Sequence, residues 1–208
     1  VILTQGFYLG KYEVTQDQYE AVMVGNSDGL SPNPSDFSGK PNHPVEKVSW
    51  NDTQVFLRRL NKLESSNVPE GWTYALPTEA QWEYACRAGT TSSFSTGLGL
   101  AESAAHFGLR WDSDNGTTKV GSYPSNQWGF HDMHGNVNEW CNDLYAPYNV
   151  SSKFDPKGAD LPDSYSSRVL RGGQWSFVFN KGLRSANRSS YYPSSRFNTQ
   201  GFRICLRR

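Results

Sequence analysis

The sequence predicts an α+β fold with sparse secondary structure and long loops. Nineteen glycines and eleven prolines among 208 residues indicate many turns. Hydrophobic residues make up 36% of the chain and aromatic residues 14%, so large rings have to supply much of the core. This aromatic content excludes a disordered chain. Helix signals lie early in the chain and short strands lie late, an order that is typical of α+β proteins.

Three helices are expected in the first half of the chain. Each begins at a capping box, in which a Ser or Thr side chain accepts a hydrogen bond from the third residue and that residue's side chain reaches back. The three boxes are Thr15–Gln18, Ser49–Asp52 and Thr78–Gln81. Apolar residues then recur at helical spacing, which gives each helix a face for the core. These faces consist of Tyr19, Val22 and Met23, then Phe56, Leu60 and Leu63, then Trp82, Ala85 and Cys86.

Short extended segments precede the helices, and two more follow late in the chain. Between them, residues 90–165 show neither the helical nor the strand spacing of apolar residues over any length. A loop of that length in a compact domain is usually functional or braced by a metal. We expect a single domain over residues 1–208. The expected extended segments are Phe7–Val14, Val45–Val48, Thr73–Leu76, Arg168–Arg171 and Gly201–Leu206.

The charge of the chain is balanced but unevenly distributed. Twenty basic and twenty acidic residues give zero net charge, which argues against a general binder of nucleic acid. No apolar run approaches the roughly 18–20 residues of a membrane helix. From Ser164 to Arg208 there are nine basic residues and no acidic one. This tail is either a basic patch for an anionic partner or an inner part of the domain whose arginines pair with acidic residues from upstream. The single spacing of its arginines favours the second interpretation.

Three cysteines, Cys86, Cys141 and Cys205, give an odd count without a CxxC motif. A zinc ribbon and a thioredoxin motif are therefore excluded. One disulfide with a free thiol and three reduced thiols both remain open on this count. P-loop, GxSxG and HExxH motifs are also absent from the sequence.

Seven motifs in one order resemble a known family. They are Gly10–Gln16, Pro44-Val45, Val48–Trp50, Leu76–Ala85, Gly135–Trp140, Arg168–Gly173 and Gly201–Arg203. Together they look like the formylglycine-generating-enzyme (sulfatase-modifying factor) domain, which is a variant of the C-type lectin fold. The resemblance covers nearly the whole chain and implies that fold. The family's first strand, with a Gly-Gly-x-Phe-x-Met-Gly pattern, is absent, so we expect a segment before Val1 in the full protein.

The resemblance also carries a test of enzymatic activity. Copper-dependent oxidases of the family use two cysteines that follow the Gly-Gly-Ser strand, and here those places hold Phe177 and Gly182. Neither residue can bind Cu(I) as a thiolate does. We therefore expect no copper and no oxidase activity. Two alternatives stay open: an oxidoreductase of the same family that uses another set of catalytic residues, and a degenerate paralogue of the oxidase.

Residues 174–200 depart from the family in a patterned way. They include six serines and six aromatic residues. Ordinary members of the family carry many Asn residues here, whereas this chain has Ser, Phe, Val, Tyr and Thr. Each of these residue types is encoded by a codon that differs from the Asn codon AAY only at its adenines. Replacement at adenines is the signature of diversity-generating retroelements. The chain resembles the variable proteins of these elements, most closely the spirochaete variable protein. The resemblance lies in the segment Arg184–Arg188 and in the closing segment Gly201–Arg203.

This second resemblance implies a binding protein with an exposed variable face. Tyr and Phe offer large contact area at low entropic cost, and Ser offers adaptable hydrogen bonds. The alternative is that these aromatic residues fill the core. Between the variable positions, Leu183, Arg184, Ala186 and Arg188 are expected to point inward, and Arg203 is expected to belong to the scaffold. The predicted face consists of Ser176, Phe177, Phe179, Ser189, Ser190, Tyr191, Tyr192, Ser195, Phe197, Asn198 and Thr199.

Such a protein is expected on a bacterial cell surface, lipid-anchored through an N-terminal segment. Its expected partner is a protein or another surface ligand, and nucleic acid is not expected. The membrane enters only through the anchor. A calcium-dependent sugar site is a weaker possibility, because no Glu-Pro-Asn or Gln-Pro-Asp triplet occurs.

The resemblance further implies a structural calcium ion in the Gly-Asn-Val loop. Its ligands would be Asp132, Gly135, Val137 and Glu139, whose oxygens suit this hard cation. The alternative is that Glu139 pairs with a scaffold arginine and no ion is needed. In related chains a cysteine of the third helix is linked to one in the last strand. Cys205 lies one residue further along than in those chains, so we predict three free thiols.

Overall fold

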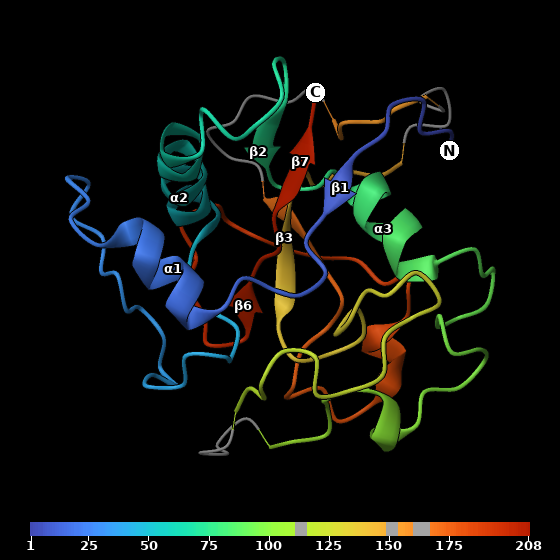
Figure 1. The fold of residues 1–208 in the computed structure, drawn as a ribbon. Helices are drawn as coiled ribbons and strands as arrows, with labels where there is room; N and C mark the ends of the chain where they lie inside the picture. Colours follow the sequence, from blue (N-terminus) through green and yellow to red (C-terminus); the bar gives the residue numbers. More distant parts are fainter. Residues whose placement is uncertain (111–115, 149–153, 160–166) are drawn as a thin grey trace.

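The computed structural model describes residues 1–110, 116–148, 154–159 and 167–208 (Figure 1). In this part of the chain, three α-helices surround two small sheets. The helices are α1 (Gln16–Met23), α2 (Trp50–Leu63) and α3 (Glu79–Arg87), with short 3-10 turns η1 (Glu102–Ala104) and η3 (Asn180–Leu183). The strands are β1 (Tyr8–Leu9), β2 (Thr73–Ala75), β3 (Asn138–Leu144), β4 (Arg168–Arg171), β5 (Ser189–Tyr191), β6 (Gln200–Gly201) and β7 (Cys205–Arg207).

All three predicted helix starts are confirmed. Thr15, Ser49 and Thr78 each form a complete capping box. The face predicted for α2 is wrong at its end, because Leu63 in the last turn is 59% exposed. Phe56 and Leu57, two turns earlier, lie against the core instead.

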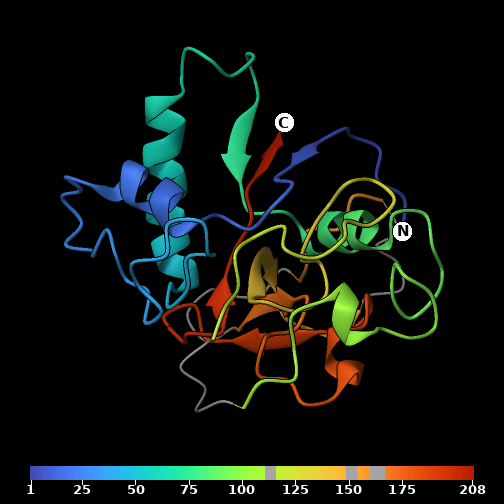
Figure 2. The ribbon, with the colours of Figure 1, turned by 60° about the horizontal axis from the view of Figure 1, so that its bottom comes forward.

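The two sheets join distant parts of the chain. The first has the order β1-β7-β2, so the last strand pairs antiparallel with both others. The second has the order β5-β4-β3-β6, in which β3 is antiparallel to β4 and parallel to β6. The orange and red segment that begins at β4 lies largely on the side of the domain away from β2, except for its last strand β7, which pairs with β2 (Figure 2).

The expected extended segments are longer than the strands that form. The segment 45–48 is not a strand, because Lys47 has a φ of 61°, outside the β region. The segment Phe7–Val14 keeps only β1, although the amide of Val14 still donates to the carbonyl of Phe202 at 2.9 Å. Residues 201–206 divide into the ends of β6 and β7.

Aromatic rings fill the core, as the composition predicts. Tyr19 stacks on Phe56 with ring centroids 5.4 Å apart, and Phe202 meets Phe56 edge-on at 5.2 Å. Trp82, Trp140 and Trp175 are fully buried. No helix in the described part of the chain has the length and apolar character needed to cross a membrane.

Candidate binding face

The buried pair of Arg203 and Glu139 joins β3 to the C-terminal segment. Both side chains are fully buried, and Nε and Nη2 of Arg203 donate to the two carboxylate oxygens, each at 2.6 Å. The indole Nε1 of Trp82 adds a third donor to Glu139 at 2.7 Å. Bidentate, charge-assisted bonds of this kind fix geometry as well as charge. Arg203 is thus a scaffold residue, as expected.

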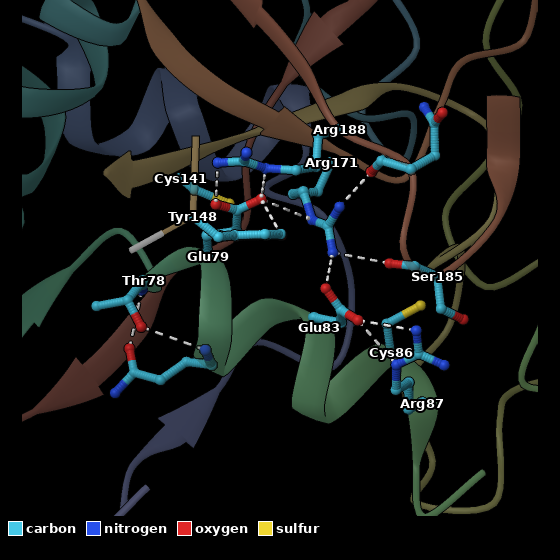
Figure 3. Close-up of polar contacts among 12 residues, drawn as sticks. Thr78, Glu79, Glu83, Cys86, Arg87, Cys141, Tyr148, Arg171, Ser185 and Arg188 are labelled. Carbon is cyan, nitrogen blue, oxygen red and sulfur yellow. Dashed lines mark hydrogen bonds and ion pairs between the residues drawn. The ribbon is translucent and has the colours of Figure 1, made fainter. Parts of the chain in front are cut away.

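A second network lies between α3 and the segment after β4 (Figure 3). Arg188 donates to both oxygens of Glu79, at 2.6 and 2.8 Å. The fully buried Arg171 lies between Glu79 and Glu83, with its Nε 3.6 Å from Glu79 Oε1 and its Nη2 bonded to Glu83. Arg171 also donates to the backbone carbonyl of Ser185 at 2.8 Å. The turn formed by residues 184–188 is therefore fixed by hydrogen bonds to buried groups of the domain.

These contacts decide between the two interpretations of the basic tail. Arg196 adds a bidentate pair with Asp52 of α2, at 2.6 and 2.7 Å. Arg171, Arg188, Arg196 and Arg203 thus all pair with acids from upstream in the chain. These four arginines tie the tail to the rest of the domain, as the second interpretation expects, whereas Lys181, Arg184 and Arg208 of the same tail are exposed.

The eleven residues of the predicted face are all accessible to solvent. The most exposed are Phe179 (71%), Tyr192 (63%), Phe197 (47%) and Tyr191 (41%). The rings of Tyr191 and Phe197 lie 5.1 Å apart. The remaining seven are intermediate in exposure: Ser176, Phe177, Ser189, Ser190, Ser195, Asn198 and Thr199. Accessibility of this kind is what a variable face requires.

Contacts join the two ends of the predicted face. The buried Trp175 donates its indole N–H to the carbonyl of Asn198 at 3.1 Å. Asn138 donates its backbone N–H to the carbonyl of Thr199 at 2.8 Å, and its side chain bonds that of Gln174. The amide of Gln174 donates to Ser176 Oγ at 2.9 Å. Ser176 and residues 198–199 are thus linked to each other through Gln174, Asn138 and the buried Trp175.

The inward direction predicted for Arg184 and Ala186 is wrong. Both side chains are exposed, whereas Leu183 is buried and Arg188 reaches Glu79 as expected. The Nε of Arg184 donates to the carbonyl of Lys181 at 3.0 Å, so its side chain folds along the surface. The role of holding the turn belongs to Arg171, which sequence reasoning assigned only to a strand. The position of Arg171 directly after the apolar pair Val169-Leu170 was the signal in the sequence that could have indicated a buried arginine.

The two carboxylates among the four predicted calcium ligands already accept hydrogen bonds from protein groups. Glu139 carries Arg203, and Asp132 Oδ2 accepts the amide of Gly121 at 2.7 Å. The amide of Val137 donates to Glu13, whose pKa is raised well above its usual value by burial and by the nearby Asp132 and Glu139. A guanidinium bound to both oxygens of Glu139 repels a second cation. The Glu139–Arg203 pair is the contact that the alternative without an ion expects, whereas calcium binding itself stays a prediction that chelation tests directly.

The three cysteines are free, buried thiols, as predicted. Cys86 Sγ lies 3.7 Å from the carbonyl of Met133, whereas Cys205 Sγ lies 3.9 Å from Gln81 Oε1. Burial raises the pKa of Cys86 and of Cys205 to about 12. Both thiols therefore stay protonated at neutral pH, which makes them poor nucleophiles.

The Sulfatase-modifying factor enzyme 1-like domain is the family whose model matches, over residues 1–208. The chain belongs to this family. Formylglycine-generating enzymes are 36% identical over 185 residues in Streptomyces coelicolor and 34% identical over 181 residues in the mouse. These matches cover 81% and 79% of this chain and 54% and 44% of the relatives. The chain thus spans about half the length of these curated relatives.

Solved structures place this family member among C-type lectin-like folds of the formylglycine-generating type, as expected. Treponema denticola variable protein 1 matches with a TM-score of 0.80 and 27% identity, covering 100% of this chain and 86% of that one. PvdO from Pseudomonas aeruginosa matches with a TM-score of 0.79 and 26% identity, covering 97% and 80%. Most of the described residues of this chain lie outside helices and strands, which is the sparse secondary structure expected from the sequence.

Phe177 and Gly182, where we expect the oxidases of the family to carry cysteines, are close neighbours in the fold. A Cβ atom added to Gly182 would lie 2.6 Å from Cδ2 of Phe177. The ring of Phe177 also packs against a small core cluster around Phe94 and Leu183. Phe177 is thus the least free member of the predicted face, because its ring fills the space that residue 182 leaves open.

Proposed function

We propose that this protein binds a macromolecular ligand through residues 174–200 and performs no chemistry there. One observation carries the proposal: Phe179, Tyr191, Tyr192 and Phe197 of this segment are exposed, whereas the buried Arg171 and Trp175 donate hydrogen bonds to backbone carbonyls of the same segment. These buried contacts fix the backbone, while the exposed side chains are free to differ. Exposed Tyr and Phe side chains are the residues that recognition surfaces use most.

The proposal extends to how the face arises. Its positions hold residues reached from AAY codons by adenine replacement, and the chain is similar to Treponema denticola variable protein 1. We infer that a diversity-generating retroelement varies this face and that the protein is displayed on a bacterial surface. The partner is a protein or another surface ligand.

Sequencing of sister copies of the gene tests this origin. We expect substitutions confined to AAY-derived codons between Gly173 and Gly201, with the codons of Lys181 and Gln200 unchanged. Substitutions spread evenly over the gene, or an invariant segment 174–200 across many copies, would contradict it.

The competing function is formylglycine formation, which the curated relatives carry in their names. It requires thiols, and Phe177 and Gly182 stand where the oxidases have them. Incubation with copper, oxygen and a Cys-x-Pro-x-Arg peptide should leave the thiol mass of the peptide unchanged. Aldehyde product above background would establish the enzyme instead.

A further inference from the structure

A large cavity lies away from the predicted face, between the N-terminal segment, α3 and the chain that follows β3. Its volume is about 1270 Å³. None of the eleven residues of the face is among the described residues that line it. The apolar part of its wall includes Phe7, Tyr84, Trp128, Phe130, Pro147 and Tyr148. Cavities of this kind, mostly apolar with a few polar groups, are typical of small-molecule sites.

Two aromatic rings on this wall are only partly covered. Tyr84 is 52% exposed and Trp128 is 45% exposed, and their ring centroids lie 4.8 Å apart. Phe7 approaches Tyr84 edge-on at 6.4 Å. The ring of Tyr148, in contrast, is already covered by the guanidinium of Arg188 at 4.0 Å. The Tyr84–Trp128 pair therefore offers the free apolar surface on which a ligand can lie.

The charged groups of the wall are paired, with one exception. Glu79 binds Arg188, and Glu83 binds Arg87 at 2.8 Å (Figure 3). Arg171, behind the wall, contacts both of these glutamates. Asp143 is 3% exposed, and no ion pair within 4.0 Å joins it to a residue in the described ranges.

The carboxyl group of Asp143 has one free oxygen. Its Oδ2 accepts the backbone N–H of Glu79 at 2.9 Å, whereas Oδ1 has no hydrogen-bond partner among the described residues. Burial, together with the charge of Glu79, raises the pKa of Asp143 to about 7, although the amide of Glu79 and the charges of Arg207 and Arg188 lower it. A buried carboxylate without a partner is unfavourable, so a cation that reaches Oδ1 gains the pairing that the protein does not supply.

We propose that this cavity binds a small organic cation, an arylalkyl or alkyl ammonium whose charged head donates to Asp143 Oδ1 and whose apolar body lies against Tyr84 and Trp128. The ammonium supplies the missing donor, and the rings remove the apolar body from water. Within residues 174–200 only the scaffold residue Arg188 lines the cavity, and none of the eleven residues of the predicted face does, so failure of this proposal leaves the proposed function untouched.

Three probes of one shape test the chemistry of the site. They are 2-phenylethylammonium, the neutral 2-phenylethanol and the anionic 3-phenylpropanoate, titrated at pH 8 by calorimetry and by tryptophan fluorescence. We expect the ammonium to bind at least tenfold more tightly than either of the others. Equal affinity for the alcohol, a preference for the carboxylate, or no binding of any probe would overturn the proposal.

Two variants localise the site. Asp143→Asn keeps an oxygen for the amide of Glu79 and should abolish the preference for the ammonium over the alcohol. Trp128→Ala should weaken both probes, and Tyr191→Ala, on the predicted face, is the matched control that should change neither. A preference that persists in Asp143→Asn, or a loss in Tyr191→Ala equal to that in Trp128→Ala, contradicts the assignment.

Discussion

The inner and outer sides of the C-terminal segment reverse the usual distribution of residue types. On the inner side, the guanidinium groups of Arg171 and Arg203 are buried against carboxylates. On the outer side, the rings of Phe179, Tyr191 and Tyr192 face solvent. Charged groups are almost never fully buried unless they are paired. The comparison shows how one segment divides two tasks: the arginines hold the backbone, and the rings are left for recognition.

The largest expected effect comes from breaking the inner side. Arg203→Ala leaves Glu139 buried without its partner, which should lower the free energy of unfolding by about 3–5 kcal/mol. Urea denaturation measures the loss. Arg58→Ala removes a guanidinium from the exposed pair with Asp28 and is the control, expected to change stability by about 0.5 kcal/mol at most. A loss from Arg203→Ala as small as that of the control would show that the pair does not hold the scaffold.

Glu46 sharpens the comparison because it is a buried carboxyl without a guanidinium. Its Oε1 accepts the amide of Phe37 at 3.0 Å, and its Oε2 has no partner among the described residues. Burial raises the pKa of Glu46 from 4.5 to about 7. The folded state therefore holds a proton that the unfolded state releases, and stability falls as pH rises between these values.

Glu46→Gln removes this penalty. The variant should gain stability over the parent as pH rises from 5 to 8, by up to about 3 kcal/mol at the upper end. Urea denaturation at several pH values measures the difference, which should level off above pH 7. A difference that does not depend on pH would mean that Glu46 titrates normally.

The outer side should tolerate loss of its rings. Changing Tyr191 and Tyr192 together to Ala should alter the free energy of unfolding by less than about 1 kcal/mol, because surface changes disturb little packing. Binding of the ligand should be abolished, since exposed aromatic anchors commonly dominate binding energy. Unfolding of the double variant would place these tyrosines in the core and remove the main support for a binding face.

The smallest expected effect concerns calcium. Glu139 and Asp132 already have protein donors, so a chelator should leave the melting temperature unchanged. Differential scanning calorimetry with chelator and then with excess calcium checks this. A rise in melting temperature with calcium would restore the site in the Gly-Asn-Val loop, since a ligand of the folded state stabilises it.

Local signals in the sequence predicted the local parts of the structure. The capping boxes at Thr15, Ser49 and Thr78 lie where the helices begin, since each depends on residues three positions apart. The role of Arg171 in holding residue 185 was not predictable, because these two residues meet only in the folded chain. The unpaired state of Asp143 likewise follows from three separate segments and leaves no mark on the sequence.

A library that replaces single residues of the segment 168–208, displayed and sorted for folded protein, tests the division of tasks most directly. The exposed positions Phe179, Tyr192 and Phe197 should accept most residue types, since surface changes usually cost about 0.5 kcal/mol or less. Arg171 and Arg203 should accept almost none, because each guanidinium is fully buried and pairs with carboxylates of the fold. Equal tolerance on the two sides, or stricter limits on the rings than on the arginines, would contradict the account.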